Sequence, residues 1–402
     1  MSSIKLKHSG GNGVSIASPD TNPASDKTVK LPATNGTLLT TDSSPSFRNL
    51  IINGAFNVAQ RSASSTSGGY ASVDRFKVVD NNTNVTITQS QHALTSSDTG
   101  PWAKGFRNSW KQELSAAGNS LDGTTYLYLV HLIEGQDIAC SGWDYTSASS
   151  YITLSFWFKA STNQTFYGRL MANDGTTQNY PFSFTATGND TWTKITKTIP
   201  GASNNQINND NGAGLKLEIA LYAGADRTDS GVSLNTWAAY ASGTRIPDMA
   251  NTWITAGTSS FELTGVQLEP GETATEFEHK SYGEELRRCH RYYYRIHPTA
   301  NGDVLTGSAW TPFQNVAQGI TFFPVDMRTR VTALEQSGTA AHYQVSYGSG
   351  GGDCSAVPTF QHGGLNCAAT SFTLSGTPWT VGDSVRPSNK TTDGFLAWSA
   401  EL

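Results

Sequence analysis

The chain has little charge, few cysteines and no long apolar run. Only 15% of its 402 residues are Asp, Glu, Lys or Arg, and the formal net charge is −5. No dense run of Lys or Arg occurs, so we expect no nucleic-acid partner. The stretch YITLSFWF is too short to cross a bilayer, and the opening MSSIKLKHSGG lacks the apolar core of a secretion signal. We therefore expect that the protein does not insert into a membrane. We also expect that it is assembled in the cytoplasm.

Four cysteines are too few for a disulfide framework in a chain of this length. They are Cys140, Cys289, Cys354 and Cys367, and we expect buried thiols. Cys354 and Cys367 could bridge a loop in oxidising surroundings, and the sequence leaves this open. His362 lies between them without a tetrahedral ligand set at metal-finger spacing, so no metal or other cofactor is expected. Whether a structural calcium is bound also stays open.

Small and polar residues take the place of charged ones. Glycine contributes 39 residues, and Ser, Thr, Asn and Gln fill much of the rest. These residue types are poor helix formers, which predicts an all-β fold with many turns. Because single hydrophobic cores stop growing beyond roughly 250 to 300 residues, we expect two domains and an appendage.

Residues 1–45 have a strand pattern but little apolar surface. Short apolar pairs alternate with clusters of Gly, Asn, Pro and Ser, and the pairs are Ile4 and Leu6, Val14 and Ile16, and Val29 and Leu31. So few apolar side chains cannot enclose a core. The segment is therefore either disordered or ordered by identical copies or a docking partner, and we expect a stalk or attachment segment.

Residues 46–280 contain longer alternating runs, which predict one large β-sandwich. One face of YITLSFWFKA is apolar and is expected to be core: Ile152, Leu154, Phe156 and Phe158. The other face is expected to meet water or a ligand: Thr153, Ser155, Trp157 and Lys159. The run GLKLEIALYAG repeats this pattern, with an outward face made of Lys216, Glu218 and Tyr222.

One helix is expected between the domains, at residues 281–295. Ser281 and Glu284 form a capping box, and apolar residues follow at helical spacing. Residues 296–402 return to short strand-like runs between Gly-rich turns, which predicts a smaller C-terminal β-sandwich. Residues 292–294 are all Tyr, and we expect this amphipathic row to pack at the junction between the domains.

Two passages resemble parts of bacteriophage structural proteins. The first passage is FRNLIINGAFNVAQR followed by YASVDRF. It is similar to the opening of a jelly-roll module common in phage tail fibre and virion proteins. The close of that module and its exit helix resemble GVQLEPGETATEFEHKSYGEELRRCHRYYYR. Together they enclose residues 47–294, well over half of the chain. Between them, YITLSFWFKAS and TWTKITKTIPG are similar to strands of the carbohydrate-binding modules attached to many glycosidases.

The other segments resemble further parts of the same particles. The leader GVSIASPDTNPASDKTVKLPATNGTLLTTDSS looks like stalk and attachment repeats of phage fibres, and FFPVDMRTRV with WSAEL resembles the matching C-terminal domain. The resemblance implies a homotrimeric virion subunit, assembled in the host cytoplasm and held to other virion proteins by its N-terminus. As a tail fibre or appendage it would bind host surface polysaccharide. The alternatives are a capsid or tail decoration protein without receptor binding, and the glycan-binding module of a carbohydrate-active enzyme.

Aromatic residues are the candidates for glycan binding, because sugar rings stack on flat aromatic faces while polar groups hold their hydroxyls. In the jelly roll we expect a cleft made by Trp143, Tyr145, Trp157, Tyr167 and Arg169. In the C-terminal domain the candidates are Trp310 and Trp379. The same residues could instead fill a second core layer or a trimer interface, and the sequence leaves this open.

No catalytic site is expected. Glycoside hydrolysis needs two carboxylates held roughly 5 to 10 Å apart across a sugar. The acids that flank a loop and a strand are expected to be solvated: Asp137, Asp144, Glu262 and Glu269. No catalytic triad, phosphate-binding loop or metal-ligand cluster is evident, so we expect a non-enzymatic protein.

Overall fold

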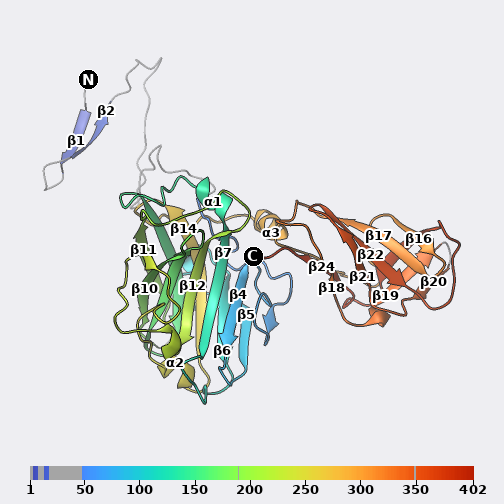
Figure 1. Ribbon diagram of the computed structural model, residues 1–402, viewed down its shortest axis with the longest axis horizontal. Helices are drawn as coiled ribbons and strands as arrows, with labels where there is room; N and C mark the ends of the chain where they lie inside the picture. Colours follow the sequence, from blue (N-terminus) through green and yellow to red (C-terminus); the bar gives the residue numbers. More distant parts are fainter. Residues whose placement is uncertain (1–2, 8–12, 18–47, 189, 348–349) are drawn as a thin grey trace. The chain divides into compact units, whose positions relative to one another are not determined.

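The computed structural model describes residues 3–7, 13–17, 48–188, 190–347 and 350–402 (Figure 1). Its architecture is all-β, and the pairings between its strands are antiparallel. The chain divides into two compact units, Met1–Pro45 and Ser46–Leu402.

The first unit contains two described strands, β1 (Ser3–Lys7) and β2 (Gly13–Ala17), which pair with each other. They coincide with the first two apolar pairs expected to be strands. The third pair, Val29 and Leu31, lies outside the described residues.

The second unit begins with a jelly-roll-type sandwich of two six-stranded sheets, which we call the β9 sheet and the β8 sheet after a central strand of each. The β9 sheet has the order β13 (Ala238–Ala239), β10 (Gln178–Ala186), β9 (Gln164–Ala172), β12 (Ala213–Ala223), β7 (Tyr126–Glu134) and β4 (Phe76–Asn81). The β8 sheet has the order β11 (Thr193–Pro200), β8 (Tyr151–Ala160), β14 (Ser260–Pro270), β6 (Asn108–Leu114), β5 (Ile87–Ala93) and β3 (Ser64–Ser65).

The core of the sandwich lies between these sheets and is rich in aromatic rings. The four residues expected to face inward from β8 are at most 1% exposed, which confirms that strand's inward face: Ile152, Leu154, Phe156 and Phe158. The Phe158 ring lies 4.8 Å from that of Phe184 on the opposite sheet. Burying each such side chain contributes about 1.5 to 3 kcal/mol to folding.

A β-bulge in β12 reverses one expected orientation. Lys216 and Glu218 face outward, but the pairing with β7 shifts between Ala220 and Tyr222. The shift places Tyr222 opposite Leu127, and its side chain is 8% exposed within the core. The prediction that Tyr222 shares the outward face is therefore wrong, because one extra residue in a strand inverts the alternation beyond it.

In the passage FRNLIINGAFNVAQR, which resembles a phage module, Asn53 and Gly54 have structural roles in the sandwich. Asn53 takes a left-handed conformation with a φ of 63°, and its side chain donates hydrogen bonds to the carbonyl oxygens of Val58 and Asp74. A Cβ on Gly54 would lie 2.0 Å from the carbonyl oxygen of Val266, so no larger residue fits there. These motif residues hold the backbone in place.

Helix α3 (Tyr282–His290) follows the sandwich. The Ser281 hydroxyl accepts a hydrogen bond from the backbone N–H of Glu284, which confirms the predicted cap. The helix is shorter than the expected residues 281–295, because strand β15 (Tyr293–Ile296) begins within that range. The remaining helices described are α1 (Gly135–Ala139) and α2 (Thr252–Thr255), with 3-10 turns η1 (Trp102–Lys104), η2 (Ala225–Arg227) and η3 (Ala340–His342).

The C-terminal domain contains a three-stranded and a seven-stranded sheet. The first has the order β15, β24 (Leu396–Ser399) and β18 (Glu335–Gln336). The second has the order β20 (Gly350–Asp353), β19 (Tyr343–Tyr347), β23 (Ser384–Asn389), β16 (Ala309–Phe313), β17 (Val316–Phe322), β22 (Cys367–Thr373) and β21 (Thr359–Gly363).

Buried ionic and aromatic contacts join the sandwich to the C-terminal domain. Arg75 is fully buried, forms an ion pair with Glu401 and donates to the carbonyl oxygen of Leu132 at 2.7 Å. Its guanidinium also lies 3.4 Å from the centre of the Tyr292 ring. Tyr292 packs with Ile52 and Val58 of the sandwich, while the Tyr294 ring stacks on Trp398 of the C-terminal domain, so the row lies at the junction as predicted.

Candidate functional site

The structure does not bring the five residues of the expected jelly-roll cleft together. Trp143 is 4% exposed in the sandwich core, and its indole N–H donates to the carbonyl oxygen of Ser150. Tyr145 packs half-buried beside it and donates to the carbonyl oxygen of Ile207. Both belong to the loop between α1 and β8, so they support the end of the sandwich.

Trp157 lies on the outer face of the β8 sheet, as its position in the strand predicts, but it is half-buried. Residues 94–107 cross this face and pack against it. A Cβ on Gly100 of that segment would lie 2.8 Å from the Trp157 ring. Phe106 and Trp192 are buried in the same apolar cluster. Trp157 therefore anchors a loop of its own chain.

Charged groups complete the contact between this segment and the β8 sheet. The Asp98 carboxylate accepts from the Trp192 indole and from Lys159, each at 3.0 Å. Burial opposes its ionisation, yet these donors lower the pKa of Asp98 to about 2. Glu262 also contacts Lys159 and is 3% exposed, and Glu269 is 1% exposed. The prediction that these two glutamates are solvated is wrong, whereas Asp137 and Asp144 are exposed.

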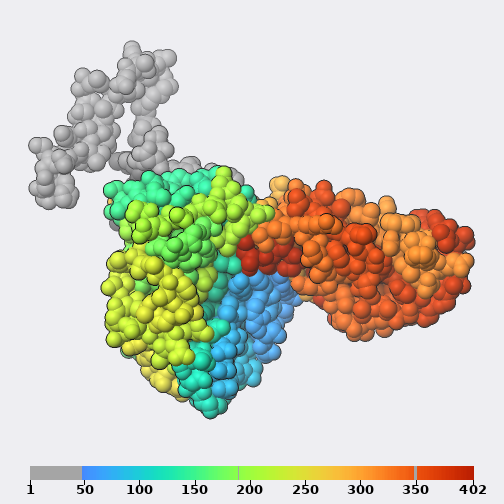
Figure 2. Space-filling model, viewed as in Figure 1, coloured from blue at the N-terminus to red at the C-terminus, as the bar shows by residue number. Residues whose placement is uncertain are grey.

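The outer face of the β9 sheet is covered by residues 224–252, a long segment between β12 and α2. Ile246 of this segment packs against Tyr128 and Val130 of β7. The Tyr167 hydroxyl contacts the carbonyl oxygen of Asp248 at 3.5 Å. Figure 2 shows these residues, in yellow-green, forming the surface over strands that Figure 1 labels β10 and β12.

Arg169 is buried beneath this segment in an ion pair. Its Nε lies 2.5 Å from the Glu218 carboxylate, which Lys216 also approaches at 3.2 Å. Burial alone would raise the pKa of Glu218, but Arg169 and Lys216 lower it to about 2. One guanidinium nitrogen of Arg169, Nη1, has no hydrogen-bond partner among the described residues.

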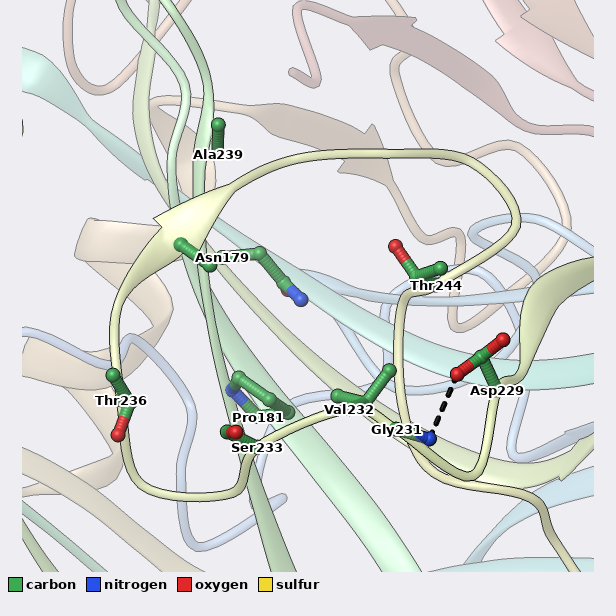
Figure 3. A pocket seen from close by; sticks show the side chains of 10 residues that line it. Asn179, Pro181, Asp229, Gly231, Val232, Ser233, Thr236, Ala239 and Thr244 are labelled. Carbon is green, nitrogen blue, oxygen red and sulfur yellow. Dashed lines mark hydrogen bonds between the residues drawn. The ribbon is translucent and has the colours of Figure 1, made fainter.

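A pocket of about 330 Å³ opens between β10 and the covering segment (Figure 3). Its floor consists of Asn179 and Pro181, and Pro181 lies directly opposite Arg169 in the pairing of β10 with β9. Its rim is built from short side chains of the segment: Asp229, Gly231, Val232, Ser233, Thr236, Ala238, Ala239 and Thr244. The segment is held at the sheet edge, because Asn235 donates from its backbone to the carbonyl oxygen of Pro181 at 2.8 Å.

The pocket offers hydrogen-bonding groups that are not all satisfied internally. The Asn179 amide donates to the carbonyl oxygen of Arg245, but its Oδ1 is buried and accepts no hydrogen bond from the described residues. One oxygen of Asp229 accepts from the backbone of Gly231 at 2.7 Å, a bond drawn in Figure 3. Because the Asn179 Oδ1 is shielded from solvent, the groups that the pocket presents to a ligand are the exposed Asp229 carboxylate and the hydroxyls of the rim.

The chemistry of the lining favours binding over catalysis. Asp229 is the only ionisable side chain among the lining residues. An acid and a base held on opposite sides of a bond therefore do not occur in this pocket. Hydroxyl and amide groups around a neutral floor match the donors and acceptors of an uncharged polyol such as a sugar.

The two C-terminal candidates have different environments. Trp379 is 4% exposed and belongs to the domain core, whereas Trp310 on β16 is 41% exposed. The four thiols are free: Cys289 and Cys354 are buried as expected, but Cys140 is exposed and Cys367 half-buried. Cys354 and Cys367 therefore do not pair in this structure.

Sequence reasoning missed the residues that line the pocket. Ser233, Thr236 and Thr244 lie in a Gly-rich, Ser-rich stretch that has the composition of an ordinary turn. Asn179 follows the polar stretch NDGTTQ, and its burial depends on contacts with Ala238 and Arg245, which come much later in the chain. No local pattern marks these residues, since the pocket exists only where distant parts of the chain meet.

The part of the chain that the structure describes contains three short α-helices. No helix there combines the length and apolar character needed to span a membrane. No group of three or more His, Cys, Asp or Glu side chains there is arranged to hold a metal ion.

No family model and no curated protein matches the chain. Among solved structures, the enzymatically active domain of tailspike protein 4 of bacteriophage CBA120 shares 10% identity over 56% of this chain and 21% of its own, with a TM-score of 0.29. TmCBM61 in complex with β-1,4-galactotriose shares 11% identity over 56% of this chain and 99% of its own, with a TM-score of 0.26. The family 11 carbohydrate-binding module of Clostridium thermocellum shares 10% identity over 51% and 95%, with a TM-score of 0.25. At these TM-scores the likeness transfers neither ligand nor activity to this chain.

Proposed function

We propose that the chain is a non-enzymatic subunit of a tailed-phage virion that binds a host surface glycan through the pocket over β10. The observation that carries the binding role is the pocket itself, with its neutral floor and its rim of exposed hydroxyl groups. The virion role rests on the sequence resemblance of residues 47–294 and of the leader to phage fibre proteins. A tail fibre or other appendage would combine the glycan-binding role with the virion role.

A pocket-filling variant tests the binding role. Ala238 is exposed at the rim, so Ala238→Trp should occupy the pocket without disturbing the core. We expect at least about a tenfold loss of affinity for the glycan that the wild type binds best on an array, since loss of one buried hydrogen bond already corresponds to that factor. Ala116→Trp, at an exposed loop position away from the pocket, is the matched control.

The outcome separates three functions. Binding that falls with Ala238→Trp but not with the control supports a receptor-binding subunit. No wild-type binding on an array of bacterial surface glycans would favour a decoration protein without receptor binding. Unchanged binding in Ala238→Trp would remove the pocket from the proposal.

Assembly is part of the same proposal. A homotrimer attached to other virion proteins by residues 1–45 would supply the apolar partners that this segment lacks. Sedimentation equilibrium at micromolar concentration should give three times the subunit mass, and the mass of one subunit would contradict the trimer. A chain lacking residues 1–44 should fold, because the compact unit Ser46–Leu402 stays whole. It should fail to enter particles, and normal incorporation would assign attachment to another segment.

A further inference from the structure

The seven-stranded sheet of the C-terminal domain has one buried and one open face. Alternate residues of β16 and β17 point into the domain core, among them Ala309 and Ala317, which are at most 5% exposed. Their neighbours point outward. Trp310 is 41% exposed and Phe322 is 70% exposed. No described segment shields these two large apolar side chains from solvent.

The strand register places Trp310 within a row of uncharged polar residues. Trp310 is paired with Ser384 on one side and with Gln318 on the other. Gln318 is paired with Ser371, and Ser371 with Thr359. Neighbouring strands lie about 4.8 Å apart, so this row of five residues crosses the sheet over roughly 19 Å.

This row has the composition of a surface for a sugar chain. A partly exposed indole offers a flat apolar face to a sugar ring, while amide and hydroxyl groups beside it can bond the ring hydroxyls. Ser384 and Thr359 of the row are exposed and Gln318 is half-buried, whereas the Ser371 hydroxyl is shielded from solvent. The row thus provides an apolar stacking partner beside accessible polar side chains.

A cation without a partner lies next to the row. Arg386 is on β23, two residues beyond Ser384 and therefore on the same face. Its backbone pairs with Ser346 of β19, but its guanidinium is exposed and makes no ion pair or hydrogen bond with the described residues. The acid of this face, Asp353, is already paired with Lys390 at 2.5 Å. Among the described residues of this outer face, Arg386 therefore presents a positive charge without a partner, on a chain whose net charge is −5.

We propose that this face is a second glycan-binding surface and that its ligand is an anionic polysaccharide. Trp310 stacks on a sugar ring, and its neighbours Ser384 and Gln318 form hydrogen bonds with the hydroxyl groups of that ring. Arg386 binds the carboxylate or sulfate group of the same sugar or of the next one. A guanidinium suits this role because it forms paired hydrogen bonds with planar anions. The inference rests on the proposed function for the class of ligand, but it uses a different domain from the pocket.

Two variants of the full chain test the proposal on an array of uronate-, sialate- and sulfate-bearing oligosaccharides printed beside neutral counterparts. Trp310→Ala should weaken binding to the preferred anionic probe at least about tenfold. Arg386→Gln should weaken it by a similar factor at low salt and less at high salt, because screening already reduces the charge contribution. Phe313→Ala, 63% exposed on the same strand, is the control and should bind as the wild type does.

Several outcomes would overturn the second surface. These are no wild-type binding to any anionic probe, equal binding to charged and neutral probes, or full binding by Trp310→Ala. A change in sedimentation of Trp310→Ala without a change in glycan binding would instead make the face a contact between copies of the chain. If Ala238→Trp abolishes all binding while Trp310→Ala abolishes none, the proposed function stands and the second surface falls.

Discussion

The sandwich and the C-terminal sheet use their outer faces in opposite ways. Both outer faces of the sandwich are covered by the chain itself, one by residues 94–107 and the other by residues 224–252. The described outer face of the C-terminal sheet has no such cover, and Trp310 remains 41% exposed. An outward-facing aromatic residue is therefore a loop anchor in one domain and an accessible surface in the other.

This difference explains why Trp157 and Trp310 are not equivalent candidates. Each occupies an outward strand position beside polar neighbours. Trp157 packs under Gly100 and beside Trp192, whereas Trp310 remains 41% exposed at its position in the strand register. Ligand binding by Trp157 would require residues 94–107 to leave the face that they cover.

The largest effect is expected where the two domains are joined. Glu401→Ala would leave Arg75 buried without its ionic partner, and removing one member of a buried pair costs about 3 to 5 kcal/mol. Urea unfolding followed by tryptophan fluorescence should show this loss. The exposed pair Asp353–Lys390 provides the control, since Asp353→Ala should cost less than about 1 kcal/mol. Equal losses in the two variants would contradict a special role for the junction.

Trp157→Ala should have the next largest effect on stability. A fully buried Trp costs about 3 to 5 kcal/mol on truncation, so a half-buried one should cost about 2 to 3 kcal/mol. The melting temperature should fall by several degrees, while glycan binding by the folded protein stays unchanged. Weaker binding at unchanged stability would show that the β8 face is the ligand groove after all.

Acid should destabilise the sandwich through His131. This residue is 1% exposed, and both ring nitrogens lack hydrogen-bond partners among the described residues. Burial, reinforced by the positive charge of Arg75, lowers the pKa of His131 well below its usual value. The unfolded chain therefore binds a proton that the folded chain does not, and stability falls as the pH drops below about 6.5.

A variant isolates this contribution. Relative to His131→Leu, the wild type should lose about 1.4 kcal/mol for each pH unit between 6 and 5. Denaturant unfolding of both proteins across this range measures the difference. Parallel stability curves would mean that His131 is not the group that titrates. Asp74 has the opposite effect on stability as the pH falls, because burial raises its pKa to about 6. Both proteins contain Asp74, so its contribution cancels in the difference between them.

The smallest effect on stability is expected at Trp310. Its ring is partly solvated, and substitutions at exposed positions change stability by about 0.5 kcal/mol. Trp310→Ala should therefore unfold within about 1 kcal/mol of the wild type in the same urea assay. A loss as large as that of Trp157→Ala would show that the C-terminal face is covered in solution, and the contrast between the domains would disappear.

The sequence supported the fold more completely than the site. Strand alternation identified the inward row of β8, and a capping box located the start of α3 at Ser281. Both are local signals whose physical basis lies within about ten residues. The inward turn of Tyr222 escaped prediction because a bulge leaves no mark in the alternation. Of the expected site residues, Trp143 and Trp379 belong to the cores of their domains. Trp157 lies on the β8 sheet, whereas Tyr167 and Arg169 lie on the opposite β9 sheet.

The sequence by itself determined the all-β class, the inward row of β8 and the start of α3, because period-two alternation and helix capping act over short stretches of chain. Only the tertiary structure decided which outer faces stay open. Each covering segment leaves from a strand of its own sheet, but it docks on strands far from it in the sequence: residues 94–107 on β8, and residues 224–252 on β7 and β10. Their docking therefore depends on apolar area and polar partners supplied by those strands. The pocket over β10 and the exposure of Trp310 follow from that docking, so no local pattern contains them.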